Sequence, residues 1–85
     1  MPVNIKPIRK DLAKVLSKHN LLRKFEKQIA LFQDNPYYPS LRTEILEPKH
    51  LKIYSFRIDR KYRAVFVYLG KNIVEVIDIN RHYND

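Results

Sequence analysis

Three runs of apolar residues within residues 51–83 predict a β-meander. The first run, residues 51–58, alternates between apolar and polar positions, which is typical of a strand with one buried face. The second run, residues 62–69, is apolar on both faces apart from Arg63, as expected of a central strand. The third run covers residues 73–79. Short polar segments separate the runs, and such segments are typical of hairpin turns.

Upstream, apolar residues recur every three to four positions, which predicts two amphipathic helices. Asn20 interrupts the pattern, and we expect it to cap the N-terminus of the second helix. That helix should end at residues 34–36, because the residue before a proline avoids helical geometry. A helical hairpin is the economical arrangement, and one long kinked helix is the alternative. The stripes that we expect to face the core are Ile8, Leu12, Val15 and Leu16, followed by Leu22, Phe25, Ile29 and Phe32.

These elements predict an α+β fold in a single domain spanning residues 1–85. Residues 3–8 suit a short strand, which Pro7 would confine to an edge of the sheet. The connector at residues 35–50 contains three prolines, so it should be irregular apart from a short extended segment within residues 41–46. We therefore expect an N-terminal short strand and a two-helix hairpin packed on a three- to four-stranded antiparallel sheet.

Positive charge is the strongest compositional signal. The chain has 17 Lys and Arg against 9 Asp and Glu, which gives a net charge of +8 and an isoelectric point near 9.9. Residues 1–30 carry most of the excess, since they hold 8 basic and only 2 acidic groups. A basic small domain typically binds a polyanion, because neutralising phosphates releases counterions. The alternatives are a solvated helix face and a surface that binds an acidic protein.

Several function classes are disfavoured by what the sequence lacks. The single glycine, Gly70, excludes a glycine-rich phosphate loop, and no nucleophile-elbow motif occurs. There is no cysteine, and three scattered histidines do not form a metal-binding pattern, so we expect no metal and no cofactor. Without an apolar leader or a run of membrane-spanning length, we expect a cytoplasmic protein with no membrane partner.

The remaining candidate chemistry uses Arg, His, Tyr and Glu. RNA can be cleaved with these groups alone when a base takes the proton of a ribose 2′-hydroxyl and an acid protonates the departing 5′-oxygen. Histidine suits either proton transfer, because its pKa lies near neutrality. Arginine suits the phosphate, because its planar guanidinium binds two oxygens at once. These residue types are common in basic domains, so only their arrangement along the chain can indicate RNA cleavage.

The arrangement resembles the RelE/YoeB-type toxins of bacterial toxin–antitoxin modules, within the RelE/ParE superfamily. The resemblance rests on NPYYPSLRTEIL, on IYSFRIDRKYRAVF and on a final strand that closes in IDINRHY, and it covers about residues 8–83. The order of elements also matches: an edge strand, two helices and three antiparallel strands. Members with this pattern are typically mRNA interferases, which cut mRNA in the ribosomal A site and are silenced by a cognate antitoxin.

The resemblance implies roles for individual residues. Arg63 falls at the position of the phosphate-binding arginine, and His82 at that of the acid/base histidine. Tyr83 would help to position the nucleotide, as in the YoeB-like branch. Glu44 is either the second proton-transfer group or a solvated surface acid, and which of Glu44 and His82 is the base stays open. Further candidates for binding RNA phosphates are Arg57, Arg81, Lys61, Lys52 and Arg42.

The resemblance also implies partners and leaves two other functions open. The expected partners are an antitoxin, the ribosome and mRNA, and either a homodimer or a toxin–antitoxin hetero-oligomer is compatible with it. One alternative is a ParE-like inhibitor of DNA gyrase with the same fold and no nuclease chemistry. The other is a non-catalytic basic module that binds RNA or protein.

Overall fold

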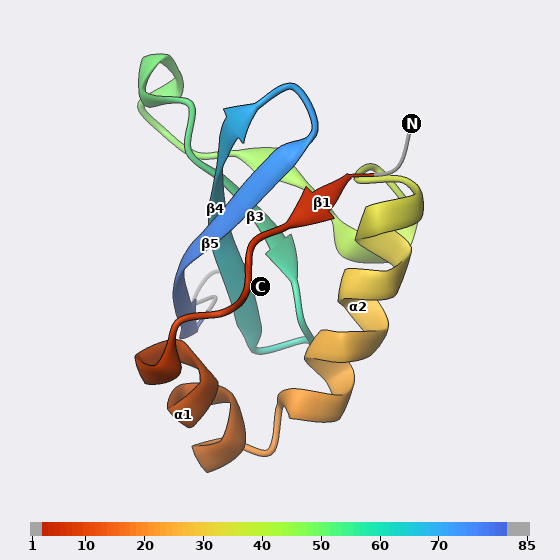
Figure 1. Cartoon of the computed structure of the whole chain (residues 1–85), viewed down its shortest axis with the longest axis vertical. Coiled ribbons are helices and arrows are strands. Elements are labelled where there is room, and N and C mark those ends of the chain that lie inside the picture. Colours follow the sequence, from red (N-terminus) through yellow and green to blue (C-terminus); the bar gives the residue numbers. More distant parts are fainter. Residues whose placement is uncertain (1–2, 82–85) are drawn as a thin grey trace.

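The computed structural model describes residues 3–81 and contains two α-helices and five β-strands (Figure 1). Two short 3-10 turns, η1 (Pro39–Leu41) and η2 (Lys49–Leu51), lie in the connector that the prolines predicted to be irregular. His82 and Tyr83 lie outside the described residues. The regular elements are β1 (Asn4–Ile5), α1 (Lys10–Lys18), α2 (Leu22–Asp34), β2 (Glu44–Ile45), β3 (Tyr54–Arg57), β4 (Tyr62–Gly70) and β5 (Ile73–Arg81).

The strands form one mixed sheet in the order β1-β5-β4-β3-β2. All neighbours are antiparallel except β1, which pairs in parallel with β5. The predicted α+β class, the meander of β3, β4 and β5 and the antiparallel sheet are confirmed, since β2 to β5 form four antiparallel strands. β1 confirms the short edge strand predicted within residues 3–8, and β2 lies within the extended segment predicted at residues 41–46.

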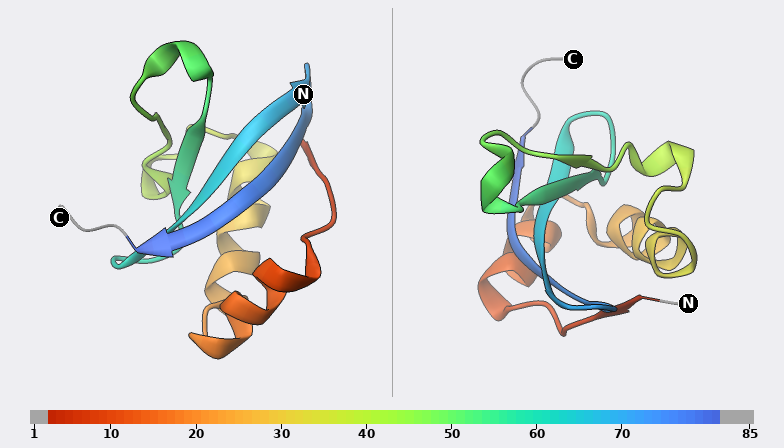
Figure 2. Two further views of the ribbon diagram at one scale, coloured as in Figure 1. Left: turned by 90° about the vertical axis from the view of Figure 1, so that its left-hand side faces the viewer. Right: turned by 90° about the horizontal axis from the view of Figure 1, so that it is seen from above.

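Both helices pack on one face of this sheet, which we call the helix face (Figures 1 and 2). Its centre is aromatic: the ring centroid of Phe32 lies 5.1 Å from that of Phe56 and 4.9 Å from that of Phe66. Phe25 stacks on the other side of Phe56 at 6.2 Å. The predicted stripe is therefore confirmed at Phe25 and Phe32. Leu22 is an exception, because it is 45% exposed while Leu21 is buried in its place.

The turn between the helices explains that exception. Asn20 was predicted to cap α2, but it adopts a left-handed conformation with φ of 56° and closes α1 instead. Its backbone N–H donates to the carbonyl of Ser17, and the N–H of Leu21 donates to the carbonyl of Leu16. Asn tolerates this conformation better than most residues, which suits the residue that follows a helix. The reversal turns Leu21 rather than Leu22 into the core.

The opposite side of the sheet, which we call the far face, carries the polar side chains of the strands. Side chains alternate between faces along a strand, and cross-strand partners share a face. Phe56 and Ala64 are partners on the helix face, so the adjacent pair, Arg57 and Arg63, points to the far face. The fold thus directs the charged side chains in the middle of the meander away from the helices.

Candidate functional site

Two arginines face each other directly across β3 and β4 on the far face. Arg57 and Arg63 are Cα partners in the register, and both side chains are half-buried. Like charges directly opposite each other in a sheet cost stability, on the order of 0.2–1 kcal/mol relative to neutral pairs. Guanidinium groups bind phosphate oxygens through charge-assisted hydrogen bonds, often two at once. The pair is therefore suited to hold a phosphate.

Arg63 is oriented by a polar chain on the neighbouring strand β5. Its Nε–H donates to Oδ1 of Asn80 at 2.9 Å, and Nδ2 of Asn80 donates to Oδ2 of Asp78 at 2.9 Å. Within residues 3–81 the terminal Nη groups of Arg63 make no hydrogen bond, so these groups can bind an oxyanion while the Nε bond fixes the side chain. The sequence analysis missed Asn80 as a positioning residue. The sequence signal for Asn80 would have been its place in the hairpin, because the register of β4 and β5 pairs Asn80 with Arg63.

Arg57 is positioned from the helix side by a buried amide. Gln28 of α2 is only 8% exposed, and its Nε2 donates to the carbonyl of Arg57 at 2.8 Å and to the carbonyl of Ser40 at 3.3 Å. One side chain thus ties the second helix, the connector and the end of β3 together. The sequence analysis also missed Gln28. The sequence signal for Gln28 was its polar side chain within the apolar stripe between Phe25 and Phe32.

Glu44 shares the far face with the two arginines. It pairs with Ser55, two residues along β3 from Arg57, and its side chain is exposed. From strand spacing and rise, the Cα atoms of Glu44 and Arg57 are about 8 Å apart. The structure therefore places Glu44, Arg57 and Arg63 on the same face of the sheet.

Arg42 lies beside this group, in a hollow at the sheet edge. The hollow has a volume of about 360 Å³, and we call it the Arg57 hollow. Arg42 itself adopts a left-handed conformation with φ of 47°, which costs a side chain of this size some strain. Lys52 adopts a similar conformation after η2, with φ of 56°, and its side chain does not line the Arg57 hollow. The hollow is lined by Gln28, Ser40, Arg42, Arg57, Asp59 and Arg60.

Two other candidates, Lys61 and Arg81, lie apart from Arg63. Arg81 follows Asn80 on β5 and so points to the helix face, where its guanidinium carbon lies 6.0 Å from the ring centroid of Tyr62. Lys61 is in the turn between β3 and β4 and lines the same hollow as Arg81. This second hollow measures about 470 Å³, and we call it the Tyr62 hollow. The predicted RNA-binding residues thus fall into two groups on opposite faces.

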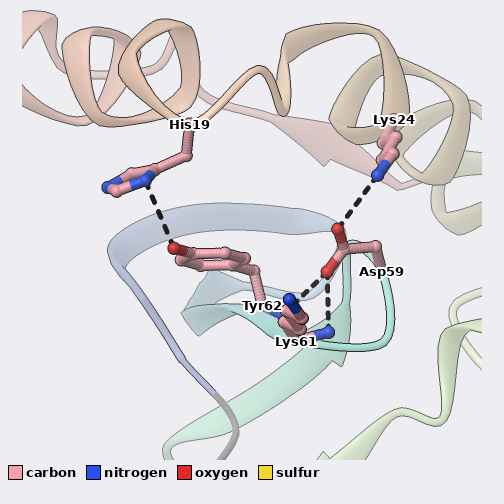
Figure 3. A network of polar contacts seen from close by, with 5 residues as sticks. All are labelled: His19, Lys24, Asp59, Lys61 and Tyr62. Carbon is pink, nitrogen blue, oxygen red and sulfur yellow. Dashed lines mark hydrogen bonds and ion pairs between the residues drawn. The ribbon is translucent and has the colours of Figure 1, made fainter.

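A network of polar contacts forms the wall of the Tyr62 hollow (Figure 3). Oδ1 of Asp59 accepts from the backbone N–H groups of Lys61 and Tyr62 at 2.8 Å each, and Oδ2 pairs with Nζ of Lys24 at 3.2 Å. Burial disfavours the charged form of Asp59, but these donors outweigh it and hold the pKa of Asp59 below its ordinary value. His19 is exposed and follows the last residue of α1, and its Nδ1 lies 3.2 Å from the hydroxyl of Tyr62.

Neither a metal-ligand cluster nor a membrane-spanning helix occurs in the described part of the chain. Residues 3–81 hold no group of three His, Cys, Asp or Glu side chains arranged to bind an ion. Neither α1 nor α2 is long and apolar enough to cross a bilayer.

Comparison with known proteins gives similarity in structure but not in sequence. No protein-family model and no curated protein sequence matches the chain. A YoeB/ParE toxin from Agrobacterium tumefaciens superposes with a TM-score of 0.70 and 21% identity, covering 98% of this chain and 100% of that one. The chain has the fold of the YoeB/ParE toxins. The YoeB of a YoeB–YefM complex from Staphylococcus aureus gives a TM-score of 0.67 and 19% identity, covering 98% of both chains.

These matches agree in fold with the resemblance that the sequence suggested. A third match, the YoeB dimer from Staphylococcus aureus, has a TM-score of 0.64 with 18% identity and 98% coverage of both chains. Near-complete coverage in both directions means that the match spans the helices and the whole sheet. At these identities the likeness concerns the fold, so the activity must be argued from the side chains.

Proposed function

We propose that the chain is the toxin of a toxin–antitoxin pair and acts as a ribosome-dependent endoribonuclease on mRNA. The observation that carries the proposal is the direct pairing of Arg57 with Arg63, with Glu44 on the same face. A YoeB/ParE fold with this polar group supports RNA cleavage better than a surface of scattered charges would, because phosphate binding and proton transfer need adjacent groups.

The proposed reaction is an attack of the ribose 2′-hydroxyl on the adjacent phosphorus. Glu44 or His82 takes the hydroxyl proton, the 2′-oxygen bonds to phosphorus, and the bond to the 5′-oxygen breaks. The other of the two residues protonates the departing 5′-oxygen, which leaves a 2′,3′-cyclic phosphate. Arg63 binds the non-bridging oxygens and stabilises the charge that develops on them. Tyr83 positions the nucleotide in this proposal.

Partner binding follows from the same proposal. One solved neighbour is a YoeB–YefM complex and another is a YoeB dimer, so we infer an antitoxin partner for this chain, with a homodimer as the alternative assembly. The cleft between the helices supports antitoxin docking, because it is largely apolar and measures about 260 Å³. The ribosome would position the mRNA, since orientation supplies much of the barrier reduction in such reactions. All these partners imply a cytoplasmic protein.

Inducible expression tests the function directly. The unaltered chain should arrest growth, and primer extension should map cuts in mRNA. Arg63→Ala and His82→Ala should relieve the arrest, and Arg63→Ala should slow single-turnover cleavage by roughly 10²–10³-fold, the usual effect of removing one group that stabilises a transition-state anion. Arg23→Ala is the control, because Arg23 is an exposed arginine on α2 with the same charge.

Three outcomes would contradict the proposal. Growth arrest that survives both substitutions would reject the mechanism. Arrest with DNA damage and intact mRNA would select a ParE-like inhibitor of DNA gyrase. Absence of arrest on expression without any antitoxin would select the non-catalytic basic module.

A further inference from the structure

The Tyr62 hollow has the electrostatics of an anion site. Four cationic side chains line it, and Asp59 is the single carboxylate among its lining residues. Asp59 is already paired with an ammonium group and two backbone N–H groups, so its charge is largely compensated. The imidazole of His19 also lines the hollow, and its ring centroid lies 5.2 Å from that of Tyr62. The four cations are Lys24, Arg60, Lys61 and Arg81.

This hollow is connected to the far face through the β3–β4 turn. Asp59 and Arg60 line both the Tyr62 hollow and the Arg57 hollow, so the two depressions share a wall. Cationic side chains therefore continue from Arg57 on the far face, past Arg60, to Arg81 on the helix face. A flexible chain of phosphates that leaves the Arg57–Arg63 pair would meet a positive surface at each step.

We infer that the Tyr62 hollow binds two backbone phosphates, one at Lys61 and one at Arg81, of the same single-stranded RNA that the far face binds, a few nucleotides away from the cleaved bond. The inference rests on the proposed function, which places an RNA phosphate between Arg57 and Arg63. RNA fits better than an acidic polypeptide for two reasons. The hollow continues the path from the proposed phosphate site, and the His19 and Tyr62 rings offer flat surfaces on which an unpaired base can stack.

Equilibrium binding separates this site from general attraction by a basic protein. The probe is a short single-stranded oligoribonucleotide with every 2′-hydroxyl methylated, so that it cannot be cleaved, and fluorescence anisotropy follows its binding across a salt series. The test variant is Lys61→Gln/Arg81→Gln. The control is Lys71→Gln/Arg23→Gln, which removes the same charge from exposed positions outside both hollows.

The expected result is a change in salt dependence. Each lost phosphate contact lowers the slope of log K against log salt by about 0.7 for single strands, so the test variant should lose about 1.4. That slope corresponds to an affinity loss of about 25-fold at 0.1 M salt, relative to the control. The single variant Lys61→Gln should lose about half of the slope change and guards against a folding defect in the double variant. Equal losses in test and control variants would overturn the inference.

Two further arms identify the ligand and separate this inference from the proposed function. If the test variant keeps its RNA slope but loses binding to poly-L-glutamate, the hollow serves an acidic protein and the inference is wrong. Cleavage is measured independently with Arg63→Ala on an unmodified mRNA bound to ribosomes. Retained cleavage in that variant, together with a reduced slope in Lys61→Gln/Arg81→Gln, would reject the proposed reaction and keep the hollow as an RNA site. An unchanged slope in Lys61→Gln/Arg81→Gln, together with lost cleavage in Arg63→Ala, would reject the hollow as an RNA site and keep the proposed reaction.

Discussion

Gln28 offers a sharp test of how the fold positions the far face. Its amide is the buried donor that holds the carbonyls of Arg57 and Ser40 from the helix side of the sheet. Replacing it with leucine keeps a similar volume but removes the donor. Both carbonyls then lose their hydrogen bond to α2, and that of Arg57 loses it at a half-buried position. We expect Gln28→Leu to fold and to be clearly less stable.

The magnitude follows from the geometry of the two bonds. A buried acceptor left unpaired costs about 1–3 kcal/mol, and the 2.8 Å bond to Arg57 should carry most of this cost because the 3.3 Å bond to Ser40 is long. The apolar side chain of leucine recovers part of it, on the order of 0.8 kcal/mol per additional buried methylene. The net loss is about 2 kcal/mol. For a domain of this size, that loss lowers Tm by about 8–16 °C.

Thermal unfolding followed by circular dichroism measures this loss. The matched control is Gln33→Leu, because Gln33 is half-buried on the same helix and its side chain makes no hydrogen bond within residues 3–81. Urea titration gives the free energy of unfolding for both variants. Equal Tm values for the two variants would refute the reasoning, since the buried amide would then contribute nothing that a leucine cannot replace.

Three further predictions concern the core, a turn and acid stability. Phe32→Ala should lower the free energy of unfolding by about 3–5 kcal/mol, because Phe32 is fully buried between Phe56 and Phe66. Urea titration measures this loss, and a value below about 1 kcal/mol would contradict the central place of Phe32 in the core. Lys52→Gly should raise Tm, because relief of a left-handed φ, about 1–2 kcal/mol, exceeds the added chain entropy of glycine; a lower Tm would contradict this. Because the folded-state pKa of Asp59 is depressed, its contribution to stability is present above the unfolded pKa of about 4 and is lost as pH falls through the folded pKa. Asp59→Asn should therefore flatten the fall in stability on acidification, and an unchanged pH profile would contradict the stabilisation of the Asp59 carboxylate by the N–H groups of Lys61 and Tyr62 and by Lys24.

The sequence predicted the core because apolar periodicity follows burial closely. The meander and the two helices were visible in the pattern, and Phe25, Phe32 and Phe56 are buried as expected. What the pattern missed depends on contacts between distant segments. The short strand and the extended segment that became β1 and β2 were expected, but their pairing with β5 and β3 joins distant segments and no local pattern encodes it. Gln28 gave a polar interruption of the stripe but no indication of which carbonyls it would meet.

The candidate site shows the same limit at the level of single residues. Arg63 and Glu44 could be assigned to one site because the resemblance supplied positions for them, and the register brings both to the far face. Arg81 was grouped with them from its place near the end of the chain. Its actual partner is Tyr62 on the helix face, since one residue along a strand reverses the direction of the side chain. The sequence therefore identified the charged residues, but it did not show that they form two separate groups.

The alternation along β4 and β5 has a physical consequence for how a small domain can bind RNA. Tyr62 and Arg63 are adjacent on β4 and Arg81 and Asn80 are adjacent on β5, yet each pair contributes one residue to each face. At the end of the sheet where these residues lie, the β3–β4 turn borders both hollows, because Asp59 and Arg60 line each of them. An RNA strand that bends around this turn can touch cations on both sides without any further domain. Such wrapping adds phosphate contacts, while the Arg57–Arg63 pair acts on one bond. Substitutions in the Tyr62 hollow should therefore reduce RNA affinity, and Arg63→Ala should reduce cleavage.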